Sequence, residues 1–357
     1  MSWIATVGSG ESWVCPKVFN NRSAPRDARM VRGSIVIETR LSPDDCPQTL
    51  LHYERHHPSP GSISLRAVPG GSISLVLTQD NEVFHTVLQP TWHARADVLR
   101  VTFSWDAQKR EGWLAVERPE GDQVTVQLTP APPPLPIEDV YTIARRPHLR
   151  EMDDDVVFVA VSTEIEPIGP MPALTDHVQV LTPFGNSRAS RLECGDTVKT
   201  RLHGVVPVLA RVSRRVPALG AFRPIRLRAP YFGLTRDLIV APQQRLLVGG
   251  SDVAYIFGRE AVLVPAHCLV NGFAARHETG PRFVCYHQLL LPKHEPLIAA
   301  GAELESLYIG RLRRRAACVE RSVLAGCPRG LMPEHARAGL KVLESFEAIT
   351  LAEARAA

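Results

Sequence analysis

The residues best suited to chemistry in this chain are its cysteines and one short cluster of histidines. Seven cysteines are spread over the sequence without a CxxC pair: Cys15, Cys46, Cys194, Cys268, Cys285, Cys318 and Cys327. Zinc sites and disulfide frameworks are recognised by close or regular cysteine spacing, which is absent here. The sequence therefore predicts no cysteine-bound metal and no cofactor, and strand-like positions such as Cys285 are expected to be small buried apolar side chains.

The histidine cluster comprises His52, Glu54, His56 and His57, whose imidazole and carboxylate groups could ligate a metal ion. The alternative interpretation is a polar strand end, because the spacing matches no metal-binding motif. The chain also lacks the GxSxG, HExxH, GxxxxGK[ST] and GxGxxG motifs of common hydrolases and nucleotide-binding proteins. We therefore predict no metal site, and an unrelated hydrolase is kept only as a third hypothesis.

Length and composition limit the class of protein. A chain of 357 residues exceeds one ordinary core and predicts two domains. No segment approaches the roughly 18 to 20 apolar residues of a membrane helix. The net charge is only +4, and the basic run 311–315 is expected to be a solvated helix face, so no nucleic-acid partner is predicted. The first residues lack the pattern of a cleavable secretory signal, which leaves the cytoplasm and export by another route both open.

The first half of the chain has the pattern of an all-β domain. Apolar and polar residues alternate in several short segments separated by turn residues. These segments are 33–41, 62–68, 72–78, 98–105, 112–117, 123–128 and 154–165. Pro69, Gly70 and Gly71 lie between two copies of the word GSISL and predict the turn of a hairpin. Three prolines and a glycine in 166–172 predict a domain boundary there.

The second half is again rich in predicted strands and ends in a different pattern. Strands are expected around 177–182, 196–200, 205–211, 223–229, 237–248, 261–264 and 283–291. Beyond residue 330, Pro333 could open a helix, and apolar residues follow at helical spacing. These residues are Leu340, Leu343, Phe346 and Ile349. The sequence thus predicts a mainly β protein with a short C-terminal helical tail.

Several N-terminal sequence segments resemble those of laminin-G and concanavalin-like domains. The resemblance is carried by VLRVTFSWDAQKREGWLAVE, with GSIVIETRL before it and VVFVAVSTEIEPIGP after it. It implies an antiparallel, jelly-roll-like β-sandwich over residues 1–168, with a glycan or a protein as partner. Trp92, Trp105 and Trp113 could meet a sugar ring, although core packing is the alternative that we favour for Trp105 and Trp113.

The C-terminal words resemble the Hint domain, the autoprocessing fold of hedgehog proteins and inteins, in the form found in many bacterial proteins. The matching words are VLTPFG, RLECGDTVKTR, PIRLRA, DLIVAPQQRLLV, EAVLVPAHCLV and VCYHQLLLPKHEPLIAAGAELESLYIG, in the family's order. The resemblance implies an all-β Hint domain over 173–310, followed by a helical tail over 311–357.

The resemblance also implies a chemistry that this sequence is not equipped to perform. Family members begin with a Cys or Ser that attacks the preceding carbonyl through a five-membered ring, so a cysteine elsewhere cannot replace it. Here that position is Ala173, whose methyl group cannot attack. A strand-borne Thr or Ser and a His assist the leaving nitrogen in the family, and here Ala241 and Gln244 stand there.

Other family positions are retained or missing. Asp196 and His294 match, and His287 matches less closely, while the terminal His-Asn needed for splicing is absent. We therefore predict a Hint protein that does not cleave itself and acts as a binding or structural module. The rival hypothesis is residual self-cleavage in which Thr175 or Thr182 attacks its own preceding carbonyl.

Overall fold

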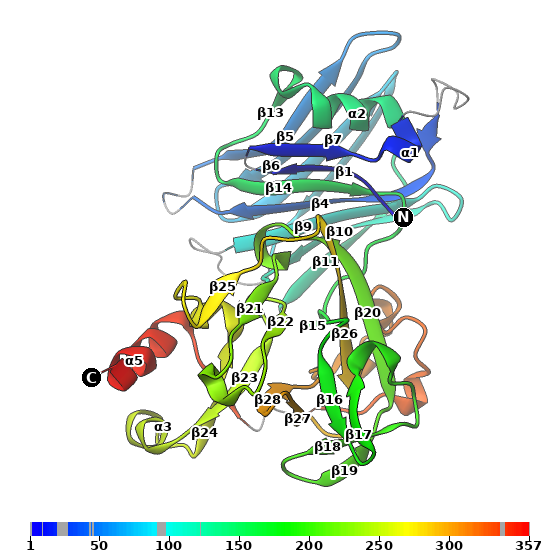
Figure 1. Ribbon diagram of the computed structural model, residues 1–357. Coiled ribbons are helices and arrows are strands. Elements are labelled where there is room, and N and C mark those ends of the chain that lie inside the picture. Colours follow the sequence, from blue (N-terminus) through cyan, green and yellow to red (C-terminus); the bar gives the residue numbers. More distant parts are fainter. Residues whose placement is uncertain are drawn as a thin grey trace. The chain divides into compact units, whose positions relative to one another are not determined.

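The protein is described by a computed structural model that covers residues 2–8, 10–19, 28–42, 44, 46–90, 98–121, 123–335 and 340–356 (Figure 1). The chain divides into two compact units, Met1–Gly169 and Pro170–Ala357. This division falls inside the proline-rich segment 166–172. Both units are built mainly from antiparallel strand pairs with few helices, which confirms the predicted mainly β fold class.

Unit 1 contains two large sheets. The seven-stranded sheet has the order β11 (Val124–Pro130), β10 (Glu111–Glu117), β9 (Val98–Asp106), β4 (Arg32–Arg40), β14 (Val156–Ser162), β1 (Trp3–Gly8) and β2 (Glu11–Val14). The five-stranded sheet has the order β13 (Arg150–Glu151), β5 (Gln48–Arg55), β6 (Gly61–Val68), β7 (Ser72–Gln79) and β8 (Glu82–Leu88). A short pair joins β3 (Arg29–Met30) to β12 (Leu135–Pro136).

The core of unit 1 lies between these sheets because alternate residues of each strand point inward. Ile73 and Leu75 of β7 are fully buried in one cluster with Ile37 of β4 and Phe103 of β9. The helices in the described residues of unit 1 are α1 (Pro16–Phe19), α2 (Ile137–Arg145) and the 3-10 helix η1 (Pro147–Leu149). The buried face of α2 adds Val140 to the same core.

The predicted hairpin between the two GSISL words is confirmed. Strands β6 and β7 pair in register from Gly61↔Gln79 to Val68↔Ser72. Gly70 and Gly71 occupy the turn with φ of 84° and 77°, a backbone conformation that favours glycine.

Unit 2 also contains two sheets. The six-stranded sheet has the order β20 (Ala210–Pro217), β26 (Phe283–Leu290), β15 (Leu174–Thr175), β22 (Leu238–Val240), β21 (Ile225–Leu227) and β25 (Ala275–His277). The nine-stranded sheet runs β17 (Gly185–Arg188), β16 (Gln179–Thr182), β27 (Pro296–Ala299), β28 (Ala302–Glu305), β23 (Arg245–Gly249), β24 (Ala261–Pro265) and β29 (Lys341–Val342), with β18 (Thr197–Thr200) and β19 (Gly204–Pro207) joined through β27.

The helical elements of unit 2 are short. They are α3 (Ser251–Phe257), α4 (Ala316–Glu320), α5 (Ser345–Ala356), and the 3-10 helices η2 (Ala189–Arg191), η3 (Gly220–Phe222), η4 (Tyr231–Gly233), η5 (Ala266–Leu269), η6 (Leu312–Arg314) and η7 (Arg329–Leu331). Within the described part of the chain, no helix has the length and apolar character needed to cross a membrane.

The segment predicted as one strand over 237–248 is two strands in different sheets. Pro242 lies in a turn in which Gln244 N donates to the Ala241 carbonyl at 3.0 Å. Strand β22 before the turn belongs to the six-stranded sheet, and β23 after it belongs to the nine-stranded sheet. The predicted strand-borne word APQQ therefore forms a connection between the two sheets of unit 2.

The C-terminal helix begins later than the sequence suggested. Helix α5 starts at Ser345 rather than at Pro333. Leu343, Ala348 and Leu351 are buried in a cluster with residues of α3 and β24. Phe346 and Ile349 are 64% and 56% exposed, so the four apolar residues noted at helical spacing do not form one buried face.

Candidate functional site

The first strand of unit 2 fixes Ala173 by its backbone. Ala173 N donates to the His287 carbonyl at 3.2 Å, and the Ala173 carbonyl accepts from Ala241 N at 2.8 Å. The residue is 3% exposed. Strand β15 thus sits between β22 and β26, and Ala173, which the resemblance assigns to the nucleophile position, has a buried methyl group there.

Gln244 lies in the turn after Ala241 and is 1% exposed. Its Nε2 donates to the Arg245 carbonyl at 2.9 Å and to the Glu305 carbonyl at 3.2 Å. Its Oε1 accepts from Gln288 Nε2 at 3.1 Å. Both amide protons are therefore occupied by backbone carbonyls, and an amide has no proton to give to a leaving group.

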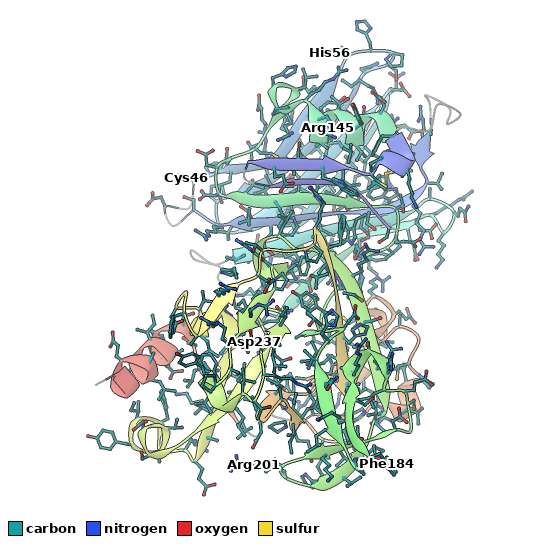
Figure 2. All side chains as sticks on the ribbon, in the orientation of Figure 1. Cys46, His56, Arg145, Phe184, Arg201 and Asp237 are labelled. Carbon is teal, nitrogen blue, oxygen red and sulfur yellow. The ribbon has the colours of Figure 1, made fainter. Side chains whose placement is uncertain are left out.

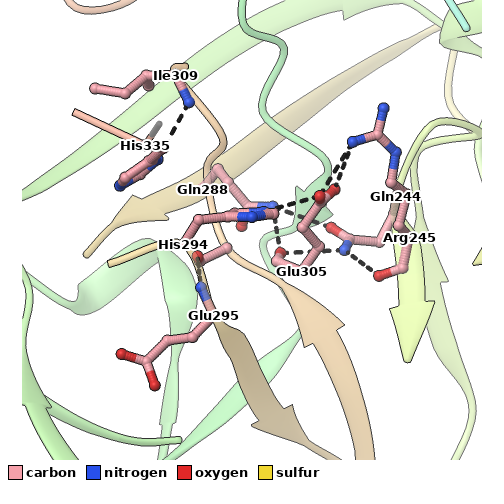
Figure 3. Close-up of polar contacts among 9 residues, drawn as sticks. Gln244, Arg245, Gln288, His294, Glu295, Glu305, Ile309 and His335 are labelled. Atoms are coloured by element: carbon pink, nitrogen blue, oxygen red, sulfur yellow. Dashed lines mark hydrogen bonds and ion pairs between the residues drawn. The ribbon is translucent and has the colours of Figure 1, made fainter. Parts of the chain in front are cut away.

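Glu305, at the end of β28, contacts Arg245 beside this turn, Gln288 of β26 and His294 (Figure 3). Glu305 Oε1 lies 3.1 Å from Arg245 Nη1 and 2.8 Å from His294 Nε2. The three side chains are 5% to 12% exposed. His294, which the sequence placed among the family positions, therefore lies against the buried Arg245–Glu305 ion pair.

Gln288 was not identified from the sequence, although it contacts Gln244 directly. Its Nε2 donates to Gln244 Oε1 at 3.1 Å and to the Glu305 carbonyl at 3.0 Å. His287 is the preceding residue of β26 and, because side chains alternate along a strand, it faces the other side of the sheet. His287 thus contributes its backbone carbonyl to Ala173 while its imidazole lies elsewhere.

The imidazole of His287 belongs to a second polar group. His287 Nε2 contacts Asp176 Oδ1, and Arg211 Nη1 lies 3.4 Å from His287 Nδ1. Cys285, two residues earlier on β26, is half-buried rather than fully buried as expected. Burial, followed by the nearby Asp176 carboxylate, raises the pKa of the Cys285 thiol. The thiol is therefore held in its protonated form near neutral pH.

Two threonines were proposed as substitute nucleophiles, and both are buried. The Thr175 hydroxyl donates to the Ile239 carbonyl at 2.7 Å. The Thr182 hydroxyl donates to the Gly185 carbonyl at 2.7 Å and accepts from Phe184 N at 3.1 Å. A hydroxyl whose proton is held by a backbone carbonyl lacks the adjacent base that would activate it.

Asp196 closes a turn before β18. Its Oδ2 accepts from Glu193 N at 2.8 Å, and its backbone carbonyl accepts from Val208 N at 2.7 Å. Gly195 beside it has a φ of 95°. Asp196 therefore has a framework role in this structure.

Among the described residues of unit 1, the tryptophan and histidine candidates are not brought together into one cluster. Trp105 is 1% exposed, with its Nε1 donating to the Met30 carbonyl at 2.9 Å, and Trp113 is 5% exposed. Both are core residues, and Trp92 lies outside the described residues. His52 Nε2 lies 3.4 Å from Glu54 Oε1, while His56 points away from the sheet at the turn after β5 (Figure 2).

One cavity among the described residues of unit 1 is small. It measures about 20 Å³ and is lined in part by Arg55, Gln79, Trp105 and Asp139. A volume of this size holds about one water molecule. Arg55 Nη1 lies 2.6 Å from Asp139 Oδ2, so the polar lining is an internal ion pair rather than a sugar site.

The basic run 311–315 is part of the fold of unit 2. It contains η6, and Arg314 Nη2 lies 2.6 Å from Glu334 Oε2. Arg313 Nη1 donates to the Met332 carbonyl at 3.3 Å. These contacts tie the run to the segment before α5.

Comparison with known proteins identifies one family and several solved structures of low sequence identity. The chain resembles the CBM40 of a Ruminococcus gnavus IT-sialidase (11% identity, TM-score 0.30, covering 46% of this chain and 89% of that chain). It also resembles a leech intramolecular trans-sialidase (10% identity, TM-score 0.27, covering 51% of this chain and 32% of that chain). A third similar structure contains the LG4-5 domains of the mouse laminin alpha1 chain (10% identity, TM-score 0.26, covering 86% of this chain and 75% of that chain). No curated protein sequence matches the chain. The family model of the Hint domain matches residues 172–311. The segment that contains Ala173, Gln244 and Glu305 is therefore a Hint domain.

Proposed function

We propose that this Hint domain does not cleave the chain and acts as a binding or structural module. The observation that carries the proposal is the environment of Ala173, where a buried methyl group stands in place of a nucleophile and both backbone groups are bonded to neighbouring strands. The engaged amide of Gln244 supports it, because the leaving nitrogen would have no proton donor. The family's sequence segments are retained, whereas the residues at its reacting centre are replaced. This combination is expected of a fold that is kept for another function.

The intact mass of the full-length protein tests this proposal. After overnight incubation at neutral pH with dithiothreitol or hydroxylamine, we expect one species at the full-chain mass. Ala173→Cys should also stay uncut, because Gln244 still cannot protonate the leaving nitrogen.

Two fragments that meet between residues 172 and 182 would contradict the proposal. A cut that disappears in Thr175→Val or Thr182→Val would establish the rival hypothesis of a substitute hydroxyl nucleophile. Cleavage of Ala173→Cys alone would show that only the nucleophile had been lost.

The binding part of the proposal concerns the five-stranded sheet of unit 1. His52, Ser64, Val76 and His85 are cross-strand neighbours in one row across β5 to β8. All four are half-buried or exposed, and the imidazoles of His52 and His85 and the hydroxyl of Ser64 could hydrogen-bond a sugar or a polar protein surface. A glycan or a protein is the partner class implied by the laminin-G-like words of the sequence.

A glycan array probed with the full-length protein tests this row. We expect binding to a subset of glycans, weakened about tenfold in His52→Ala/His85→Ala because two hydrogen bonds are lost. His148→Ala, an exposed histidine outside the row, is the matched control and should bind as the wild type does. Equal binding by the double variant, or no binding by any variant, would rule out a glycan site on this row.

A further inference from the structure

Strand pairing in unit 2 brings together three side chains of different chemistry. Cys285 and His287 are two residues apart on β26 and therefore share one face of the strand. Asp176 directly follows β15, whose Thr175 pairs with Tyr286 of β26. One ligand atom from each of the three residues lies within 4.8 Å of the other two. Among the residues that the structure describes, this is the one group of three such side chains so arranged.

We propose that Asp176, Cys285 and His287 form a zinc-binding site with one coordination position left open. A carboxylate oxygen, a thiolate and an imidazole nitrogen are the ligand types that Zn²⁺ takes in proteins. Three protein ligands with a fourth, exchangeable position are the usual arrangement of a reactive or regulatory zinc site. The site lies on the strand face opposite Gln288, so it does not depend on the proposed loss of self-cleavage.

The geometry allows an ion to enter with small movements. Tetrahedral zinc bonds of about 2.0 to 2.3 Å place the ligand atoms roughly 3 to 4 Å from one another. Cys285 and His287 are fixed by pairing of β26 with β20 on one side and with β15 on the other. The Asp176 side chain is 54% exposed, so it can move away from His287 Nε2 and admit the ion.

The proton balance of binding is simple. The Cys285 S–H bond breaks and its proton passes to solvent, and coordinate bonds form from sulfur, from Asp176 Oδ1 and from His287 Nε2. The imidazole proton moves from Nε2 to Nδ1, so His287 binds as a neutral group. The charges of one carboxylate and one thiolate then balance the charge of the ion.

Arg211 affects how tightly the site binds zinc, and this effect can be tested. Its guanidinium lies 3.4 Å from His287 Nδ1 and can only donate hydrogen bonds. A zinc-bound His287 carries a proton on Nδ1, so Arg211 must turn away when the ion binds. Replacing Arg211 by glutamine supplies an acceptor oxygen for Nδ1–H, and an acceptor at this place strengthens metal binding.

Another use of the three residues is excluded by the same contacts. A cysteine nucleophile requires its histidine to face the thiol with one nitrogen and the carboxylate with the other. His287 instead turns Nε2 to Asp176 and Nδ1 to Arg211. The arrangement is therefore suited to holding an ion between the three ligands rather than to activating the thiol.

The test is titration of metal-stripped, full-length protein with Zn²⁺ by calorimetry and with Co²⁺ by absorption spectroscopy. We expect one ion per chain and a thiolate-to-cobalt charge-transfer band. Cys285→Ser should abolish the band, and Asp176→Asn and His287→Gln should each weaken Zn²⁺ binding more than tenfold, because loss of even an outer partner costs about 10- to 100-fold. Arg211→Gln should tighten binding.

Two variants are matched controls. His177→Gln changes the exposed residue next to Asp176, and Cys194→Ser removes an exposed thiol outside the group. Both should bind zinc as the wild type does. No zinc binding, equal binding by Cys285→Ser and Asp176→Asn, or loss of the band in Cys194→Ser would overturn the proposal. Because Asp176 is exposed, Asp176→Asn keeps the test decisive if His287→Gln fails to fold.

Discussion

Glu305→Ala is expected to lower the free energy of unfolding of unit 2 by about 3 to 5 kcal/mol, the usual effect of breaking a buried ion pair. The substitution removes the carboxylate that lies 3.1 Å from Arg245 Nη1 and 2.8 Å from His294 Nε2. Both partners are largely shielded from water, so the lost interaction is not replaced by full hydration. Glu305→Gln keeps the shape and one acceptor oxygen and should have a smaller effect.

Denaturant unfolding can assign this effect to the correct unit. All five tryptophans precede residue 114, so tryptophan fluorescence reports unit 1, whereas far-ultraviolet circular dichroism reports both units. Glu305→Ala should shift the dichroism transition and leave the fluorescence midpoint unchanged. Glu303→Ala, two residues earlier on β28, removes an ion pair with Arg201 whose side chain is 59% exposed, and it should cost less than about 1 kcal/mol. Equal effects of the two variants would contradict the role assigned to Glu305.

The second large effect is a loss of stability in acid that depends on His335. Burial is the main cause that lowers the pKa of His335 from 6.5 to about 4; the hydrogen bond to the Leu291 carbonyl raises this pKa, and nearby His294 lowers it to a smaller extent. The folded state therefore prefers the neutral imidazole. Stability is fully present above about pH 6.5 and is lost as the pH falls toward about 4, by at most about 3 kcal/mol.

The measurement is urea unfolding of wild type and His335→Gln at several pH values between 7 and 4. Glutamine can donate to the Leu291 carbonyl and accept from Ile309 N, as His335 does, but it does not titrate in this range. As the pH falls over this interval, the wild type should lose more stability than His335→Gln. Other acidic groups contribute equally to the stability of both proteins. Parallel pH profiles would show that His335 does not carry the acid sensitivity.

Alternation of apolar and polar residues predicted the positions of many strands, both where alternate residues are buried, as in β7, and where nearly every residue is buried, as in β9. The segment 72–78 agrees with β7 to within one residue, and 98–105 agrees with β9 equally well. Strand β5 was missed since its residues, QTLLHYER, include charged and imidazole side chains that were read as a metal cluster or a strand end. Pro242 was the overlooked signal within 237–248, where two apolar segments belong to different sheets.

The candidate site was predictable only in part. Ala173 and Gln244 were found through family resemblance, which aligns positions along the chain. Gln288 was not, since the register of β26 decides that it, rather than His287, faces Gln244. Asp176 and His287 are 111 residues apart, and their contact depends on the pairing of β15 with β26, which no local pattern in the sequence specifies.

The pairing of first and late strands has a consequence for synthesis of the chain. In unit 1, β1 pairs with β14, and in unit 2, β15 pairs with β22 and β26. Such distant contacts must await the later strand and carry a large loop-closure cost. On a translating ribosome the sandwich can close once Ser162 has emerged, and the Hint unit only after Glu305, the last residue of β28, has emerged. At about 5 to 20 residues per second, the last strand of the sandwich is synthesised roughly 10 s before the last of these Hint strands. The strands of unit 1 can therefore be paired before those of unit 2 are complete.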